Sequence, residues 1–317
     1  MFLATLALIF GIALLVYSAD EFTKNGAKIA TLLNISPLII GLLIFGFGTS
    51  APEIIVSGFA AYQGNKGISI GNAIGSNIFN ISLVLGITAI LAPVKVAQNI
   101  LKKEWVFLIF VSSVSWILLL DLNLGILDGV ILLSFLAMFL AYSFIQAKKS
   151  GHHEFENLLK ETIAEKKEKP LIIWIKLLMS LVVLLVSANI TVWGGKTLAQ
   201  LLGVPDLIIG LTIIAFGTSL PELAVSISAA LKKQHDMIVG NIIGSNLFNT
   251  LAVLSIPAIV SPGPIDAKII DRDYPIMFLL TVLLFMLSFN IHKKYTICRV
   301  DGAILLIVFT FYLYLLS

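Results

Sequence analysis

The chain has 317 residues, of which 58% are hydrophobic and 12% are charged, and its mean hydropathy is +1.02. Soluble globular domains carry about twice that share of charged residues, so the composition predicts a polytopic membrane protein. A single cysteine, Cys298, excludes an intrachain disulfide framework, and the net charge of +3 is expected to reflect membrane topology rather than a nucleic-acid partner.

Ten stretches of the chain are apolar over a length close to the roughly 20 residues that a membrane-spanning helix needs. In chain order they are Phe2–Ala19, Pro37–Tyr62, Ile68–Ala92, Trp105–Leu120, Gly129–Ala147, Leu171–Ala188, Leu207–Leu231, Met237–Val260, Pro275–Ile291 and Val300–Leu316. The first stretch lacks the basic start of a signal peptide, so we expect it to remain as a mature span. The sequence therefore predicts an all-α polytopic membrane protein with ten transmembrane helices.

An internal duplication relates the two halves of the chain. Leu38–Ser57 returns 169 residues later as Leu207–Ser226 with 14 of 20 positions identical, and Gly71–Asn80 returns as Gly240–Asn249 with 8 of 10 identical. The expected division is a first five-helix repeat at residues 1–147, a linker at 148–170 and a second five-helix repeat at 171–317. Because five is odd, the second repeat enters the membrane from the opposite face, and inverted repeats of this kind are typical of secondary transporters.

The basic residues are distributed unevenly between the two faces of this arrangement. Of the 21 Lys and Arg residues, 17 fall on the face that carries the linker. The positive-inside rule then places the linker 148–170 in the cytoplasm and both the N- and C-termini outside the cell, in a multi-pass protein of the plasma membrane.

Each copy of the first duplicated motif places a carboxylate beside a predicted helix break. Pro52 in GTSAPE lacks an amide hydrogen and its ring clashes with the carbonyl of Gly48, and Pro221 in GTSLPE acts in the same way. Carbonyl oxygens are thereby freed at bilayer depth beside Glu53 and Glu222. Oxygen ligands suit hard cations, and two acids balance a divalent ion, whereas two bare carboxylates would repel and one would take up a proton. The motif predicts a site held by Ca²⁺, Na⁺ or H⁺.

The second motif places a polar stripe on each following helix, with side chains spaced i, i+4 and i+8. The stripes consist of Asn72, Ser76 and Asn80 in the first repeat and Asn241, Ser245 and Asn249 in the second. A stripe of this kind alone is more often a helix-packing seam, and a membrane proline is often only a kink. The duplicated combination of acid, proline and stripe favours an ion site, with the stripes lining its cavity.

The motif pairs GTSAPE with GNAIGSNIFN and GTSLPE with GNIIGSNLFN resemble the paired alpha repeats of the sodium/calcium exchanger family in its compact microbial form. The resemblance implies that Ca²⁺ is held by Glu53, Glu222, Thr49 and Thr218. It implies Na⁺ sites at Gly46, Ser50, Ser76, Ala215, Ser219 and Ser245, with Asn80 and Asn249 lining the cavity. Several relatives close the second motif with an aspartate where this chain has Asn249, which argues against the potassium-dependent branch.

The resemblance also implies the activity, which is secondary active antiport rather than enzyme catalysis. Three Na⁺ would enter the cell for each Ca²⁺ that leaves, by alternating access at one central site. The transported Ca²⁺ and Na⁺ would be the ligands within the lipid bilayer, with no cofactor and no nucleic-acid partner, and a monomer is expected to suffice. The alternatives are a proton-coupled antiporter for Ca²⁺ or another divalent cation, an intramembrane metal-dependent enzyme, for which no nucleophile or base is evident, and a channel, which the proline-broken core disfavours.

Overall fold

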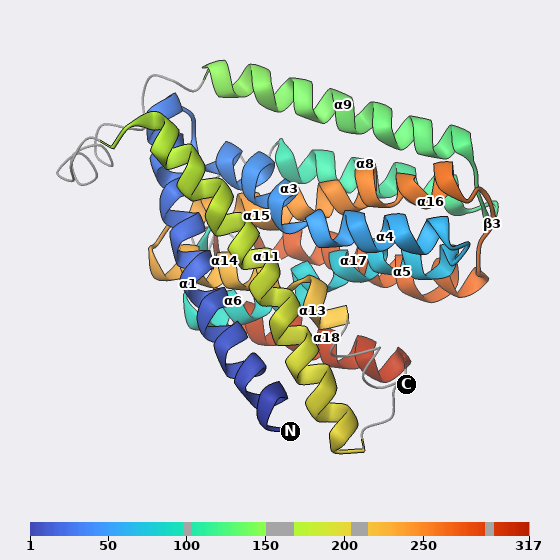
Figure 1. The fold of residues 1–317 in the computed structure, drawn as a ribbon. Helices are drawn as coiled ribbons and strands as arrows, with labels where there is room; N and C mark the ends of the chain where they lie inside the picture. Colours follow the sequence, from blue (N-terminus) through green and yellow to red (C-terminus); the bar gives the residue numbers. More distant parts are fainter. Residues whose placement is uncertain (98–102, 150–167, 204–214, 289–294, 317) are drawn as a thin grey trace.

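The computed structural model describes residues 1–97, 103–149, 168–203, 215–288 and 295–316, and these parts of the chain are almost entirely helical (Figure 1). The first repeat contains α1 (Phe2–Leu33), α2 (Pro37–Ile39), a π-helical segment η1 (Ile40–Phe45), α3 (Gly46–Thr49), α4 (Ala51–Tyr62), α5 (Lys66–Phe79), the π-helical η2 (Asn80–Val84), α6 (Leu85–Leu91), α8 (Glu104–Leu119) and α9 (Ile126–Lys149). The second contains α11 (Pro170–Leu201), α13 (Ala215–Thr218), α14 (Leu220–Leu231), α15 (His235–Phe248), the π-helical η4 (Asn249–Val253), α16 (Ser255–Val260), the π-helical η5 (Ile269–Asp273), α17 (Tyr274–Ser288) and α18 (Arg299–Leu316).

These segments form ten helical spans at the ten positions that the hydropathy predicts. Seven helices in the described residues are long and apolar enough to cross a membrane, α8 and α14 are shorter apolar helices, and α17 with η5 completes the ten. The expected spans Leu207–Leu231 and Pro275–Ile291 lie partly outside the described residues, as does most of the linker 148–170. The boundaries of the two repeats therefore remain a prediction.

The first span of each repeat extends well beyond its predicted end. The helix expected to finish at Ala19 continues to Leu33, and the one expected to finish at Ala188 continues to Leu201. The reason is that hydropathy measures which residues suit the bilayer, whereas helix-forming residues such as Glu, Lys and Ala extend a helix past it. Both helices stop where the backbone turns left-handed, at Asn34 (φ 53°) and at Gly203 (φ 78°).

Two short antiparallel pairings connect the repeats. β1 (Val94–Lys95) pairs with β4 (Thr296–Ile297), and β2 (Asn123–Leu124) pairs with β3 (Gly263–Pro264). The first pairing joins the connection after the third span to that after the ninth, and the second joins the connections after the fourth and eighth spans. Each pairing thus unites loops that an alternating ten-span path places on the same face, as the inverted repeats require.

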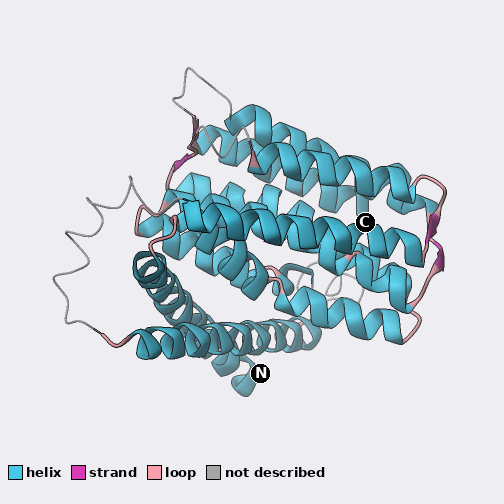
Figure 2. Ribbon diagram, turned by 90° about the horizontal axis from the view of Figure 1, so that it is seen from above, coloured by secondary structure: helices cyan, strands magenta, loops and turns pink. Residues whose placement is uncertain are grey.

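Helices α1 and α11 form a long pair that runs obliquely across the other helices (Figure 1) and lies against one side of them (Figure 2). Their backbones approach closely at Gly11, where an added Cβ would lie 2.9 Å from the backbone nitrogen of Thr191. Glu168, just before α11, also pairs with Lys28 of α1 at 3.4 Å. A hydrogen bond from Lys176 and the charge of Lys28 hold the pKa of the Glu168 carboxyl below its usual value. We call α1 and α11 the oblique pair and the other helices the core.

Candidate ion-binding site

The helix breaks predicted at the two prolines are confirmed, and both lie at the serine of the GTS sequence. Ser50 separates α3 from α4 with φ −80° and ψ 4°, and Ser219 separates α13 from α14 with φ −90° and ψ 4°. Pro52 and Pro221 each occupy the second position of the new helix, where a missing amide hydrogen costs nothing. The breaks place Glu53 and Glu222 in the first turn of α4 and α14.

The two carboxylates meet in the interior of the core, and each lies against hydroxyl groups of the opposite repeat. Glu53 and Glu222 are both 0% exposed, and they are close enough to interact electrostatically. The Glu53 carboxylate accepts a hydrogen bond from Ser76 at 3.3 Å and lies near the hydroxyl of Thr218. The Glu222 carboxylate faces the hydroxyl of Thr49. The cluster therefore contains oxygen atoms from both halves of the chain.

Many polar atoms of this cluster are buried without a hydrogen-bond partner among the described residues. They are Ser50 Oγ, Glu53 Oε2, Ser219 Oγ, Glu222 Oε1 and Oε2, Asn80 Oδ1, and Asn249 Oδ1 and Nδ2. An unpaired buried oxygen is unfavourable, and an unpaired buried carboxylate much more so. Oxygen atoms that converge in this way provide the coordination that hard cations prefer. The donor set thus fits Ca²⁺ or Na⁺ as a transported ion.

The first asparagine of each stripe supports the backbone instead of lining the cavity with its amide. Asn72 Nδ2 donates to the carbonyl oxygen of Glu53 at 3.0 Å and to Ser57 at 2.9 Å. Asn241 Nδ2 repeats the arrangement, donating to the carbonyl oxygen of Glu222 at 3.3 Å and to the Ser226 hydroxyl at 3.1 Å. Sequence reasoning did not single out the two serines, although their identity at the last position of the duplicated motif was a usable signal.

The remaining predicted residues lie around the same centre. The Thr49 hydroxyl is 3.3 Å from that of Ser245, which donates to the carbonyl oxygen of Gly46 at 3.5 Å. Ala215 opens α13, and the structure does not describe its side chain. Asn80 and Asn249 each begin a π-helical segment, a local widening that often marks functional positions.

Two further asparagines, which sequence reasoning missed, pack between the repeats. Asn80 Nδ2 donates to Asn246 Oδ1 at 3.4 Å, and Asn77 Nδ2 donates to Thr250 Oγ1 at 2.8 Å. Both missed residues follow a stripe serine directly in GSN, a position that helical spacing places off the stripe. Their hydrogen bonds to the opposite repeat show that they pack where the two repeats meet.

Comparison with known proteins assigns the chain to a protein family over nearly its whole length. The family model described as "Sodium/calcium exchanger protein" matches residues 3–145 and 172–317. The chain belongs to the sodium/calcium exchanger family. Its members are transporters and not enzymes, and Na⁺ and Ca²⁺ are their transported ions rather than cofactors.

Full-length relatives agree with this assignment. The chain is 44% identical to the CaxA protein of Alkalimonas amylolytica, with 100% of this chain and 99% of that protein covered. It is 28% identical to the sodium/calcium exchanger MaX1 of Methanosarcina acetivorans, with coverage of 98% and 97%. A solved structure of the sodium-calcium exchanger NCX_Mj, soaked with 10 mM Na⁺ and zero Ca²⁺, aligns with a TM-score of 0.84 at 33% identity and covers 100% of this chain and 99% of that one.

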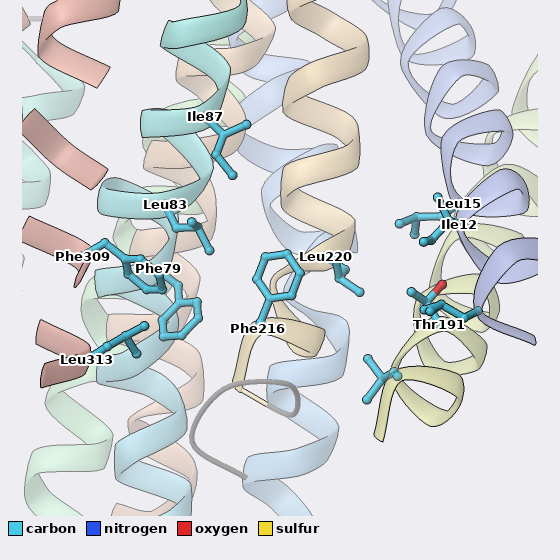
Figure 3. Close-up of a pocket in the computed structure, with 13 residues that line it drawn as sticks. Ile12, Leu15, Phe79, Leu83, Ile87, Thr191, Phe216, Leu220, Phe309 and Leu313 are labelled. Carbon is cyan, nitrogen blue, oxygen red and sulfur yellow. The ribbon is translucent and has the colours of Figure 1, made fainter. Parts of the chain in front are cut away.

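In this exchanger, the two repeats differ around the candidate site. Thr49 is 0% exposed, whereas its counterpart Thr218 is partly exposed. An apolar cavity of about 540 Å³ lies between the oblique pair and the core, with Ile12 on one wall and Phe216 and Leu83 on the other (Figure 3). The single hydroxyl among its lining residues, that of Thr191, is bonded to the Ser187 carbonyl at 2.8 Å.

Proposed function

We propose that this chain exchanges Na⁺, moving into the cell, for Ca²⁺, moving out, by alternating access at a central site that Glu53 and Glu222 form. The observation that carries the proposal is the buried cluster in which these two carboxylates lie among unpaired oxygens of both repeats. Two carboxylates balance the charge of one Ca²⁺, and an ion between them relieves both their repulsion and their desolvation.

The assignment of individual ligands extends the same reasoning. Ca²⁺ is proposed to bind Glu53 and Glu222 with backbone oxygens of Thr49 and Thr218. The proposed Na⁺ ligands and cavity walls are Gly46, Ser50, Ser76, Asn80, Ala215, Ser219, Ser245 and Asn249. Because Na⁺ and Ca²⁺ share the two glutamates in this scheme, they compete for the site, and competition at a shared site is what couples their opposite movements.

The orientation in the membrane is part of the proposal. The bias of Lys and Arg places the linker 148–170 in the cytoplasm and both termini outside the plasma membrane. One chain supplies both glutamates, which supports a monomer as the transporting unit.

The experiment is Ca²⁺ uptake into proteoliposomes. Purified protein is reconstituted with Na⁺ inside, diluted into Na⁺-free choline buffer containing ⁴⁵Ca²⁺, and compared with vesicles that contain choline on both sides. We expect uptake only with the outward Na⁺ gradient. Uptake that ignores Na⁺ and follows an imposed proton gradient would instead support the proton-coupled alternative, and uptake without any counter-ion gradient would support a channel.

A further inference from the structure

One polar connection attaches the oblique pair to the core. Lys232, at the end of α14, forms an ion pair with the carboxylate of Asp20 in α1 and donates to its carbonyl oxygen at 2.8 Å. The hydroxyl of Ser228 donates to the same carboxylate at 3.4 Å. The connection lies where α14 ends, on the face of the membrane that carries the linker.

The inverted repeat predicts an equivalent connection on the opposite face, but its residues are different. An offset of 169 residues relates Asp20 to Asn189, Lys232 to Gln63 and Ser228 to Phe59. The offset holds structurally at both helix ends concerned, because Asn34 matches Gly203 and Gly64 matches Lys233, and all four have positive φ. The equivalent positions therefore contain no charge.

The structure also shows that the equivalent contact is not made. Asn189 is exposed and its amide donates to the carbonyl oxygen of Leu185, one turn back in its own helix, at 2.9 Å. The oblique pair is thus tied to the core on the linker face, while the cavity of Figure 3 separates its other half, around Leu8 and Ile12, from α6 and α18. Relative to the two glutamates, the partly exposed Thr218 lies towards the face opposite the linker, and the buried Thr49 lies towards the linker face.

We propose that Asp20, Ser228 and Lys232 are positioning residues of the exchange cycle that decide which face of the membrane the central site favours. Their contact stabilises the present arrangement over the repeat-related arrangement, in which Asn189 would meet Gln63. The inference rests on the alternating access proposed above. When only a fraction of molecules expose the site to one face, the apparent affinity on that face falls by that fraction. The contact therefore sets the ratio of apparent KM values on the two faces.

The expected effect is moderate. The side chain of Asp20 is 53% exposed and that of Lys232 is 27% exposed, and ion pairs in such settings change an equilibrium by only about two- to fivefold. Loss of the pair should change the KM ratio by this factor, and raised ionic strength should reduce the effect.

The test measures Na⁺-dependent ⁴⁵Ca²⁺ uptake as a function of Ca²⁺ concentration in right-side-out and inside-out vesicles from cells that express each variant. Asp20→Asn and Lys232→Gln should each change the KM ratio two- to fivefold towards higher affinity on the linker face, and the double variant should add little because both remove one interaction. Lys28→Gln is the matched control, since Lys28 pairs with Glu168 within the oblique pair and should leave the ratio unchanged.

The decisive experiment moves the Asp–Lys pair to the repeat-related positions. Asn189→Asp with Gln63→Lys, added to Asp20→Asn with Lys232→Gln, should move the ratio further in the same direction. An unchanged ratio in both the removal and the transplant variants, or a reversed shift in the transplant, would overturn the proposal. If transport ran normally but depended on protons instead of Na⁺, the proposed coupling would fail, while the KM ratio measured with a proton gradient would still test Asp20 and Lys232.

Discussion

At the scale of single residues, charge and hydrogen bonding at the centre can be separated by substitution. Glutamine has nearly the shape of glutamate, so Glu53→Gln and Glu222→Gln remove one charge and retain the packing. Each variant should lose about 3–5 kcal/mol of Ca²⁺ binding free energy, or 10²-fold or more in affinity, because a buried cation loses a charged partner. Calorimetric Ca²⁺ binding and ⁴⁵Ca²⁺ uptake measure this loss, and a Glu222→Gln protein that still transports would remove that residue from the site.

The supporting asparagines should differ in the stability that they provide. Asn241 is 0% exposed, whereas Asn72 is only partly buried, and each bonds a glutamate carbonyl and a serine. Asn241→Ala leaves these buried groups unpaired and should lower the free energy of unfolding by about 1–3 kcal/mol. Asn72→Ala should cost less, because the Asn72 side chain is itself partly exposed, so that water can take its place, and Ser57 keeps its hydrogen bonds with Ser69. Thermal denaturation in detergent compares the two, and equal losses would contradict the difference in burial.

At the scale of helices, the centre depends on close backbone contact between repeats. A Cβ at Gly244 of α15 would lie 2.4 Å from the carbonyl oxygen of Leu42, and one at Gly240 would lie 2.6 Å from that of Leu38. Helices can approach this closely only where the residue is small. Gly240 and Gly244 thus allow α2 and η1 to lie directly on α15.

Gly244→Ala should therefore destabilise the protein by about 1–3 kcal/mol or more, since a backbone carbonyl cannot move aside as a side chain can. Gly58→Ala is the control, because a Cβ at Gly58 in α4 meets nothing within 4 Å and the repeat-related residue is Ile227. The control should be neutral or gain up to about 1 kcal/mol from helix propensity. Unfolding curves compare the stability of the two variants. A Gly244→Ala protein as stable as the unmodified chain would mean that η1 and α15 can move apart to accommodate the added methyl group.

Some features of the helices could be predicted from the sequence and others could not. The helix breaks at Ser50 and Ser219 were predictable, because proline acts on its own backbone and on residues within one turn. The meeting of Glu53 and Glu222 followed from the parity of the spans and the duplication. The bonds of Ser57 and the packing of Asn77 were not predictable, because they depend on which helices approach each other in the folded chain.

At the scale of the whole molecule, the inverted arrangement predicts which residues share a face. In a Cys298→Ser background, Asn65→Cys and Lys169→Cys place exposed thiols before α5 and before α11. Three spans separate residue 65 from residue 169, so the two residues lie on opposite faces of the membrane in the proposed orientation. Intact cells should therefore react with an impermeant maleimide at residue 65 only, and permeabilised cells at both. Labelling of residue 169 in intact cells would reverse the proposed orientation.

The charge that crosses the membrane in one cycle is also a property of the whole molecule. Three Na⁺ against one Ca²⁺ moves one net positive charge with Na⁺, and 100 mV acting on one charge is worth about 2.3 kcal/mol, or about fifty-fold in the equilibrium Ca²⁺ ratio. In Na⁺-loaded vesicles with valinomycin, a positive interior should therefore accelerate and increase ⁴⁵Ca²⁺ uptake, and a negative interior should slow it. The sign does not depend on how the protein is oriented, because Na⁺ leaves and Ca²⁺ enters in every vesicle. Uptake that is indifferent to the imposed potential would imply an exchange of two Na⁺ for one Ca²⁺, because two Na⁺ and one Ca²⁺ neutralise the charge of the two glutamates equally.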